Sequence, residues 1–109
     1  MWIFLPDSFV SVVADRNDDS RLLVRGRQPG DVEAFLAPVT LPTECSVSET
    51  PGADYRFRAF VPREVVARAV VAHAASIDYS NFKNTVREAA RHSAYMRVWS
   101  AMSAYQEEP

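Results

Sequence analysis

The sequence predicts an α+β fold in which an antiparallel sheet of about four to five strands packs on two or three helices. Strand-like segments dominate the first third of the chain, and a segment with two-residue alternation occupies the middle. A helical pattern of apolar residues then runs through most of 62–105. Helices that follow strands in this way pack on one face of the sheet, so a two-layer, ferredoxin-like or related arrangement is expected. The 109 residues fit a single domain over 1–109.

The strands are expected over short ranges, which are residues 2–5, 9–14, 22–27, 46–49 and 55–61. Apolar and β-branched residues are frequent in the early ranges, and turn-forming residues at 16–20 indicate a hairpin. In the last range, apolar side chains alternate with Arg56 and Arg58. This alternation predicts a buried face that begins with Tyr55 and an open face that carries the arginines.

Helices are expected over residues 31–37, 62–77 and 82–105, the last of them continuous or broken near 91–93. Asp31 is of the residue type that caps a helix N-terminus, and Pro62 opens the second helix where its missing N–H costs least. His73 falls on the apolar stripe of that helix. We expect it to be packed and hydrogen-bonded in the core.

Composition argues against several classes of protein. The net charge of −2 argues against binding of polyanions through the overall field. Cys45 is the only cysteine, so no internal disulfide indicates an oxidising compartment. No segment approaches the roughly 18 apolar residues of a membrane span, and the apolar start of the chain lacks the basic leader of a secretion signal. We therefore expect a cytoplasmic protein with no membrane partner.

Catalytic and cofactor-binding motifs are not found in the sequence. The few glycines form neither a phosphate loop nor a dinucleotide loop, and one cysteine with two histidines gives no zinc spacing. No cofactor and no metal are therefore expected. Cys45 is expected to behave as a small apolar residue, with a nucleophile paired with His73 or His92 as the alternative. The acidic segment 15–19 is interpreted as a solvated hairpin tip, with weak Mg²⁺ or Ca²⁺ binding as the alternative.

Basic residues gather in two places. One group is expected on the open face of the sheet if strands 22–27 and 55–61 are neighbours, and it comprises Arg25, Arg27, Arg56 and Arg58. The other belongs to the final helical region and comprises Lys83, Arg87, Arg91 and Arg97. Basic groups interleaved with aromatic rings are typical of surfaces that bind single-stranded nucleic acid. The acidic total charge, and the core-like helical spacing of Tyr95 and Trp99, favour a solvated basic face instead.

The segment YSNFKN, from Tyr79 to Asn84, lies between two helical patterns. Asp78, Ser80 and Asn81 can each cap a helix, which favours a helix–helix corner. Other polar and aromatic groups remain unexplained by this interpretation, and they are Tyr79, Lys83, Asn84, Arg91 and His92. The alternative is a corner that also binds an anion or a peptide.

The segments DYSNFKN at 78–84 and RHSAYMRVWS at 91–100 occur with MWIF at the start and DYRFR at 54–58. Together they resemble a group of small bacterial proteins labelled hypothetical. The resemblance covers most of the chain and implies a stand-alone domain of this length. It also implies that the two C-terminal segments are characteristic parts, and it carries over no activity and no catalytic residue.

These observations favour a small binding or regulatory module that acts on another macromolecule, with a protein partner or a homodimer expected first. Several aromatic residues exceed what a small two-layer core consumes, namely Trp2, Phe60, Trp99 and Tyr105. An exposed apolar patch built from such residues marks an interface.

Two other functions remain as alternatives. One is nucleic-acid binding by the arginine-rich sheet face and the basic final helix. The other is a small enzyme that uses Asp78, Tyr79 and His92 on an anionic substrate. Whatever the function, the candidate binding residues are Tyr79, Asn81, Lys83, Asn84, Arg91, His92, Arg56 and Arg58.

Overall fold

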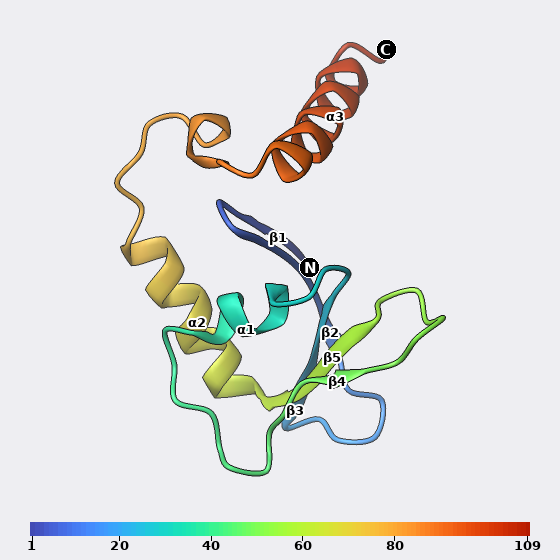
Figure 1. Ribbon diagram of the computed structural model, residues 1–109, viewed down its shortest axis with the longest axis vertical. Coiled ribbons are helices and arrows are strands. Elements are labelled where there is room, and N and C mark those ends of the chain that lie inside the picture. The colour runs from blue at the N-terminus through green and yellow to red at the C-terminus, as the bar shows by residue number, and fades with distance from the viewer. The chain divides into compact units, whose positions relative to one another are not determined.

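The computed structural model describes residues 1–109, and the chain divides into two compact units, Met1–Ile77 and Asp78–Pro109 (Figure 1). The first unit contains a five-stranded sheet with two helices, which confirms the predicted α+β class. The second contains a short 3₁₀ helix and one long α-helix. None of the helices combines the length and the apolar character needed to cross a bilayer. The expectation of a single domain over 1–109 stays a prediction.

The sheet is antiparallel throughout, with strand order β1-β2-β3-β5-β4. Its strands are β1 (Trp2–Leu5), β2 (Ser8–Ala14), β3 (Arg21–Gly26), β4 (Ser48–Glu49) and β5 (Phe57–Pro62). Strands β1 to β3 follow one another as a meander, whereas the ferredoxin-like order alternates as βαββαβ. The protein is therefore a related α+β arrangement and not a ferredoxin-like one. The last two predicted strands are shorter at their beginnings than expected.

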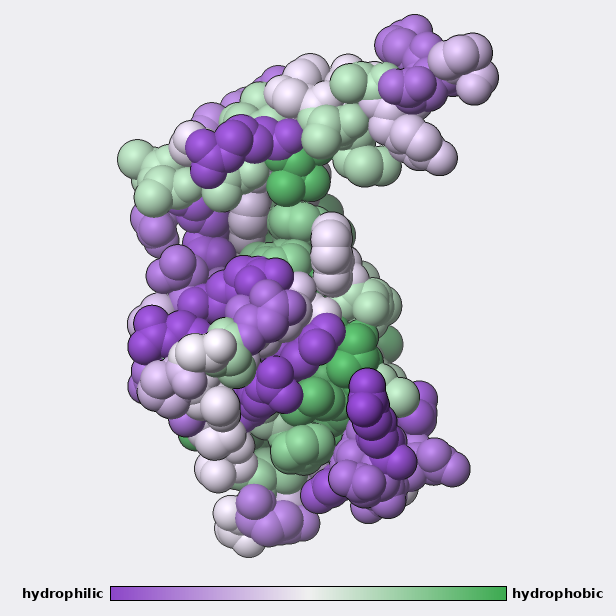
Figure 2. Space-filling view, turned by 90° about the vertical axis from the view of Figure 1, so that its right-hand side faces the viewer, coloured by the Kyte–Doolittle hydropathy of each residue, from purple (hydrophilic) through white to green (hydrophobic).

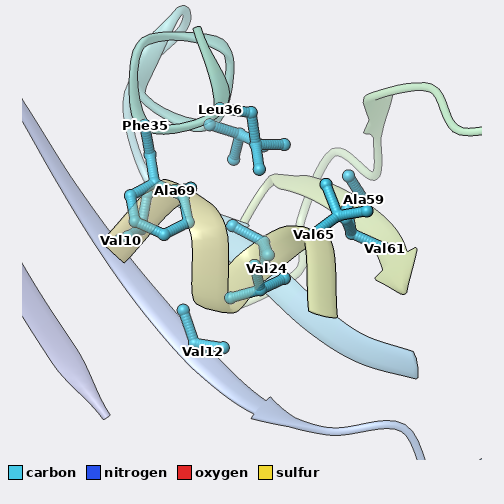
Figure 3. Close-up of a cluster of buried hydrophobic side chains, with 11 residues drawn as sticks. Val10, Val12, Val24, Phe35, Leu36, Ala59, Val61, Val65 and Ala69 are labelled. Carbon is cyan, nitrogen blue, oxygen red and sulfur yellow. The ribbon is translucent and has the colours of Figure 1, made fainter. Parts of the chain in front are cut away.

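Two helices, α1 (Asp31–Leu36) and α2 (Arg63–Ala75), supply the buried side chains that cover one face of this sheet. Figure 3 shows Val65 and Ala69 of α2 near sheet residues such as Val24. β-Branched valines suit a pleated surface, and burying one of them stabilises the fold by about 1.5–3 kcal/mol. Phe35 of α1 is the largest fully buried side chain and completes this core.

Asp31 does not cap α1 as expected. The N-cap is Gly30, whose φ of 88° lies in the left-handed region that glycine adopts at little cost. Asp31 is only 3% exposed, and its Oδ2 accepts a hydrogen bond from the backbone N–H of Phe9 at 3.0 Å. The carboxylate therefore ties the start of α1 to β2, because a buried acid needs a donor and one was available in a distant segment.

In the second unit, η1 (Lys83–Thr85) and α3 (Ala89–Gln106) replace the helix predicted over 82–105. The chain is extended at Val86 and Glu88, so the break lies near 86–88 and not near 91–93. Neither helix has a side-chain cap, so the prediction that Asp78, Ser80 or Asn81 caps a helix is wrong.

The Asp31 contact gives a prediction about stability. Asp31→Ala is expected to lower the free energy of unfolding by about 1–3 kcal/mol, because the Phe9 N–H loses its acceptor. Asp31→Asn keeps an oxygen at this place and is expected to cost less. The measurement is urea denaturation followed by far-UV circular dichroism.

Glu33→Ala, an exposed acid on the same helix, is the matched control and is expected to change stability by less than about 0.5 kcal/mol. Equal losses from Asp31→Ala and Glu33→Ala would contradict the role assigned to Asp31.

Candidate functional site

One face of the sheet lies opposite the core, and we call it the open face. Directly opposed residues of antiparallel strands lie on the same face. The strand register therefore places one row of side chains across all five strands, comprising Trp2, Ser11, Arg25, Arg58 and Ser48. A second row, on the same face, comprises Val13, Leu23 and Phe60. The expectation that strands 22–27 and 55–61 are neighbours is thus confirmed.

The arginines of this face differ in their partners. Arg56 Nη2 lies 2.8 Å from Glu49 Oε2, and Arg27 Nη1 lies 3.1 Å from Asp54 Oδ1. The hydrogen bond to Asp54 raises the pKa of Arg27 further above its ordinary value. Arg25 and Arg58 have no carboxylate within ion-pair distance. Of the four guanidiniums expected on the open face, these two carry uncompensated charge.

Tyr55 is buried, as the alternation predicts, but it lies against two arginines and is not part of the main core cluster. It lies before the first residue of β5, so the strand alternation that placed it on the core face does not hold there. Its ring is 4.4 Å from the Arg25 guanidinium carbon and 4.1 Å from that of Arg27, and only 4% of Tyr55 is exposed. Cation–π contacts of this kind stabilise a cation that has no carboxylate partner.

Further hydrogen bonds fix the two uncompensated arginines in place. Arg25 Nη2 donates to Ser11 Oγ at 2.8 Å, while Arg25 Nε is buried and has no acceptor. Arg58 Nε donates to the carbonyl oxygen of Tyr55 at 3.2 Å. Each guanidinium thus uses only part of its donor capacity within the protein.

A pocket of about 680 Å³ opens beside these arginines. Its lining includes the apolar side chains of Val13, Leu23 and Phe60, with Arg25 and Arg58 among its polar walls. Ala14 at the end of β2 and Asp15, Arg16 and Asn17 of the β2–β3 loop complete the lining. Figure 2 shows, in its lower half, hydrophobic surface bordered on both sides by hydrophilic residues.

The acidic loop beside the pocket is not a solvated tip at Asp15. Its side chain is 1% exposed, and Oδ2 accepts hydrogen bonds from Arg21 Nε at 2.9 Å and Nη2 at 2.6 Å. Its Oδ1 accepts the backbone N–H of Asn17. Asp18 accepts from the hydroxyl and the N–H of Ser20, and these bonds lower the pKa of Asp18. The carboxylates of Asp15 and Asp18 are therefore engaged with protein donors.

In the second unit, the YSNFKN segment folds back on the first half of α3. The Phe82 ring stacks on Tyr95 with centroids 5.8 Å apart, and Tyr79 lies 5.9 Å from Phe82. Lys83 Nζ lies 5.7 Å from the centroid of the Trp99 ring. Contacts between rings, and not helix capping, hold this segment.

The candidate residues of this segment are only partly brought together. Arg91 lies beside Glu88 and donates to the hydroxyl of Tyr95 at 3.4 Å. The side chains of Asn81, Asn84 and His92 make no hydrogen bond within the protein. No hydrogen bond joins Asp78, Tyr79 and His92, so the arrangement contains no proton relay among them.

Within its own unit, α3 leaves large apolar side chains uncovered. None of its residues is buried, and its exposed large side chains are Val98, Trp99, Met102 and Tyr105, which we call the α3 face. Trp99 is 57% exposed and Tyr105 68%. The interpretation of Trp99 as a core residue is therefore wrong. The expectation that Trp2, Phe60, Trp99 and Tyr105 exceed the needs of the core is confirmed, since all are exposed.

His73 and Cys45, which were considered as catalytic residues, are both packed within the first unit. His73 Nε2 lies 2.8 Å from the carbonyl oxygen of Phe35, and the imidazole stacks on the Phe35 ring, which confirms the predicted packed histidine. Cys45 is half-buried, and this burial raises the pKa of its thiol. A raised pKa lowers the thiolate fraction and weakens a nucleophile.

Comparison with known proteins gives no match, whether to a family model, a curated protein or a solved structure. The function must therefore be argued from the surfaces themselves.

The sequence interpretation missed the pocket and the part played by Arg25 in it. Leu22 and Val24 alternate with Leu23 and Arg25. This alternation could have predicted that Leu23 and Arg25 share the open face. No pattern along the chain indicates which arginines form ion pairs. Arg27 pairs with Asp54 and Arg56 with Glu49, and neither pair has a regular sequence spacing.

The raised pKa of Cys45 gives a prediction about reactivity. At pH 8, alkylation of Cys45 by iodoacetamide is expected to be several-fold slower than that of an unfolded peptide with the same flanking residues, because less thiolate is present. Mass spectrometry of timed samples measures both rates. A faster reaction in the folded protein would show that a neighbour stabilises the thiolate and would revive the nucleophile alternative.

Proposed function

We propose that this protein is a small cytoplasmic binding module that engages a protein partner through the α3 face. The observation that carries the proposal is that the second half of α3 is exposed and presents large apolar side chains at three- and four-residue spacing. Helices with anchors at this spacing commonly dock their apolar face in a groove of a partner.

The limited packing of α3 within its own unit supports this proposal. Most helical stability in proteins comes from packing of an apolar face and not from the intrinsic propensity of the residues. The contacts of α3 with the rest of its unit include Tyr95 with Phe82, Arg91 with Glu88 and Trp99 with Lys83. Met102 and Tyr105 are left as exposed apolar surface for a partner to cover.

The charge of α3 favours a protein over a nucleic acid. Arg91 and Arg97 are its only Lys, Arg, Asp or Glu residues, and Arg91 already lies beside Glu88. Nucleic-acid binding depends on several cations that release counterions from phosphates. On the open face, ion pairs neutralise Arg27 and Arg56. Fewer free cations are therefore available there for binding a nucleic acid. A second copy of this chain is one form that the protein partner takes under this proposal.

Capture from a nuclease-treated native extract tests this function, with tagged wild-type protein beside Trp99→Ser/Met102→Ser. The double variant is expected to lose the partner by about tenfold or more, because each buried anchor of an interface contributes about 2 kcal/mol or more. Light scattering of the purified protein tells whether the partner is a second copy. Both variant side chains are exposed, so the fold of the first unit is expected to persist.

Val71→Ser is the matched control, since Val71 is an exposed apolar residue of α2 in the other unit. It is expected to keep wild-type capture. Equal capture by all three proteins would contradict the role of the α3 face. Capture that disappears on nuclease treatment would favour nucleic acid instead.

A further inference from the structure

We propose that the open-face pocket binds a carboxylate group joined to an apolar body, with Arg25 and Arg58 as its cation pair. The pocket is lined wholly by residues of the first unit, so this inference does not depend on the function proposed for α3. It assigns a ligand class to a surface that the sequence marked only as basic.

The first argument is the positive charge of Arg25 and Arg58 in the pocket. Arg25 and Arg58 are direct cross-strand partners, so their side chains leave the same face of the sheet as neighbours. Neither has a carboxylate partner, although the nearby arginines Arg21, Arg27 and Arg56 each have one. Asp15 also lines the pocket, but its carboxylate is ion-paired with Arg21, and Arg16 adds a further cation to the lining. Two like charges held side by side, with no acid paired to either, favour an anion between or above them.

The second argument is that Arg25 and Arg58 have N–H donors left over for a ligand. Ser11 takes one N–H of Arg25, and the Tyr55 carbonyl takes one of Arg58. A guanidinium has five N–H donors, so both side chains retain donors that no protein group accepts. The Arg25 Nε is buried without an acceptor, so the donors left for a ligand are among the Nη groups of both arginines.

The apolar wall gives the third step and defines the body of the ligand. Val13, Leu23 and Phe60 line the same pocket as the two cations. Phe60 is exposed, and on its other side it contacts the guanidinium of Arg21, 5.0 Å from its ring centroid. An apolar surface beside convergent polar donors is the usual composition of a small-ligand site.

A carboxylate fits this site better than a phosphate. The planar guanidinium fork matches the two oxygens of a carboxylate. Phosphate sites usually add backbone N–H groups from a helix N-terminus or a glycine-rich loop. No helix begins at the pocket, and the N–H of Asn17 in the adjoining loop is already taken by Asp15.

The experiment is a titration of the ¹⁵N-labelled full chain followed by amide chemical shifts. The probe is 3-phenylpropionate, compared with the neutral 3-phenylpropanol and with inorganic phosphate. Saturable shifts at Leu23, Arg25, Arg58 and Phe60 are expected with the carboxylate, and much weaker ones with the alcohol or phosphate. A blocked tripeptide that ends in phenylalanine, as acid and as amide, tells whether a peptide terminus or a free acid is preferred; either preference for the acid form supports the proposal.

Arg58→Gln is expected to weaken 3-phenylpropionate binding by about tenfold or more, because charge-assisted hydrogen bonds are lost. Arg56→Gln removes the same charge from the neighbouring ion pair and is the matched control, with little change expected. Phe60→Ala tests the apolar wall and is expected to weaken binding several-fold. The absence of saturable shifts, equal losses in Arg58→Gln and Arg56→Gln, or tighter binding of phosphate would each overturn the proposal.

Discussion

The antiparallel pairing of β3 with β5 decides what the first unit buries and what its open face presents. In this register Val24 opposes Ala59 on the core side, while Arg25 opposes Arg58 on the other. A slip of one residue in either strand would send its arginine into the core and its apolar neighbour into water. The free energy gained by burying Val24 and Ala59 therefore also fixes the positions of the two cations. Core packing and the candidate pocket depend on the same ladder of hydrogen bonds.

The uncompensated arginines have an energetic cost that the surrounding residues reduce only in part. The Tyr55 ring faces Arg25 and Arg27, and Ser11 accepts one hydrogen bond. Burying a donor without an acceptor costs about 1–3 kcal/mol, and Arg25 Nε is such a donor. Arg21, by contrast, forms ion pairs with Asp15 and Asp18. The presence or absence of a carboxylate partner therefore distinguishes an arginine in a structural ion pair from one that is a candidate ligand contact.

The parts of the fold that follow local pattern were predictable from the sequence, and the parts that depend on distant partners were not. The strand alternation and the apolar stripe of α2 gave the class, the sheet neighbours and the packed His73. Asp31 was misassigned because its donor, Phe9, lies in another strand. Tyr55 is buried as predicted, but it lies against arginines and outside the main core cluster, because β5 begins after it and alternation holds only inside a strand. Asp15 was taken for a solvated residue because its partner Arg21 lies across the hairpin.

The α3 face illustrates the same limit at the level of function. The spacing of Val98, Trp99 and Met102 predicts a helix with an apolar stripe, but a stripe that packs on the chain's own core has the same spacing as one that docks on a partner. Only burial separates the two cases, and burial depends on residues elsewhere. The stripe is exposed, and the few ring contacts within its unit leave most of it without the packing that usually stabilises a helix. Binding and ordering of α3 are then expected to be coupled, since a partner that covers the stripe supplies the free energy that holds the helix.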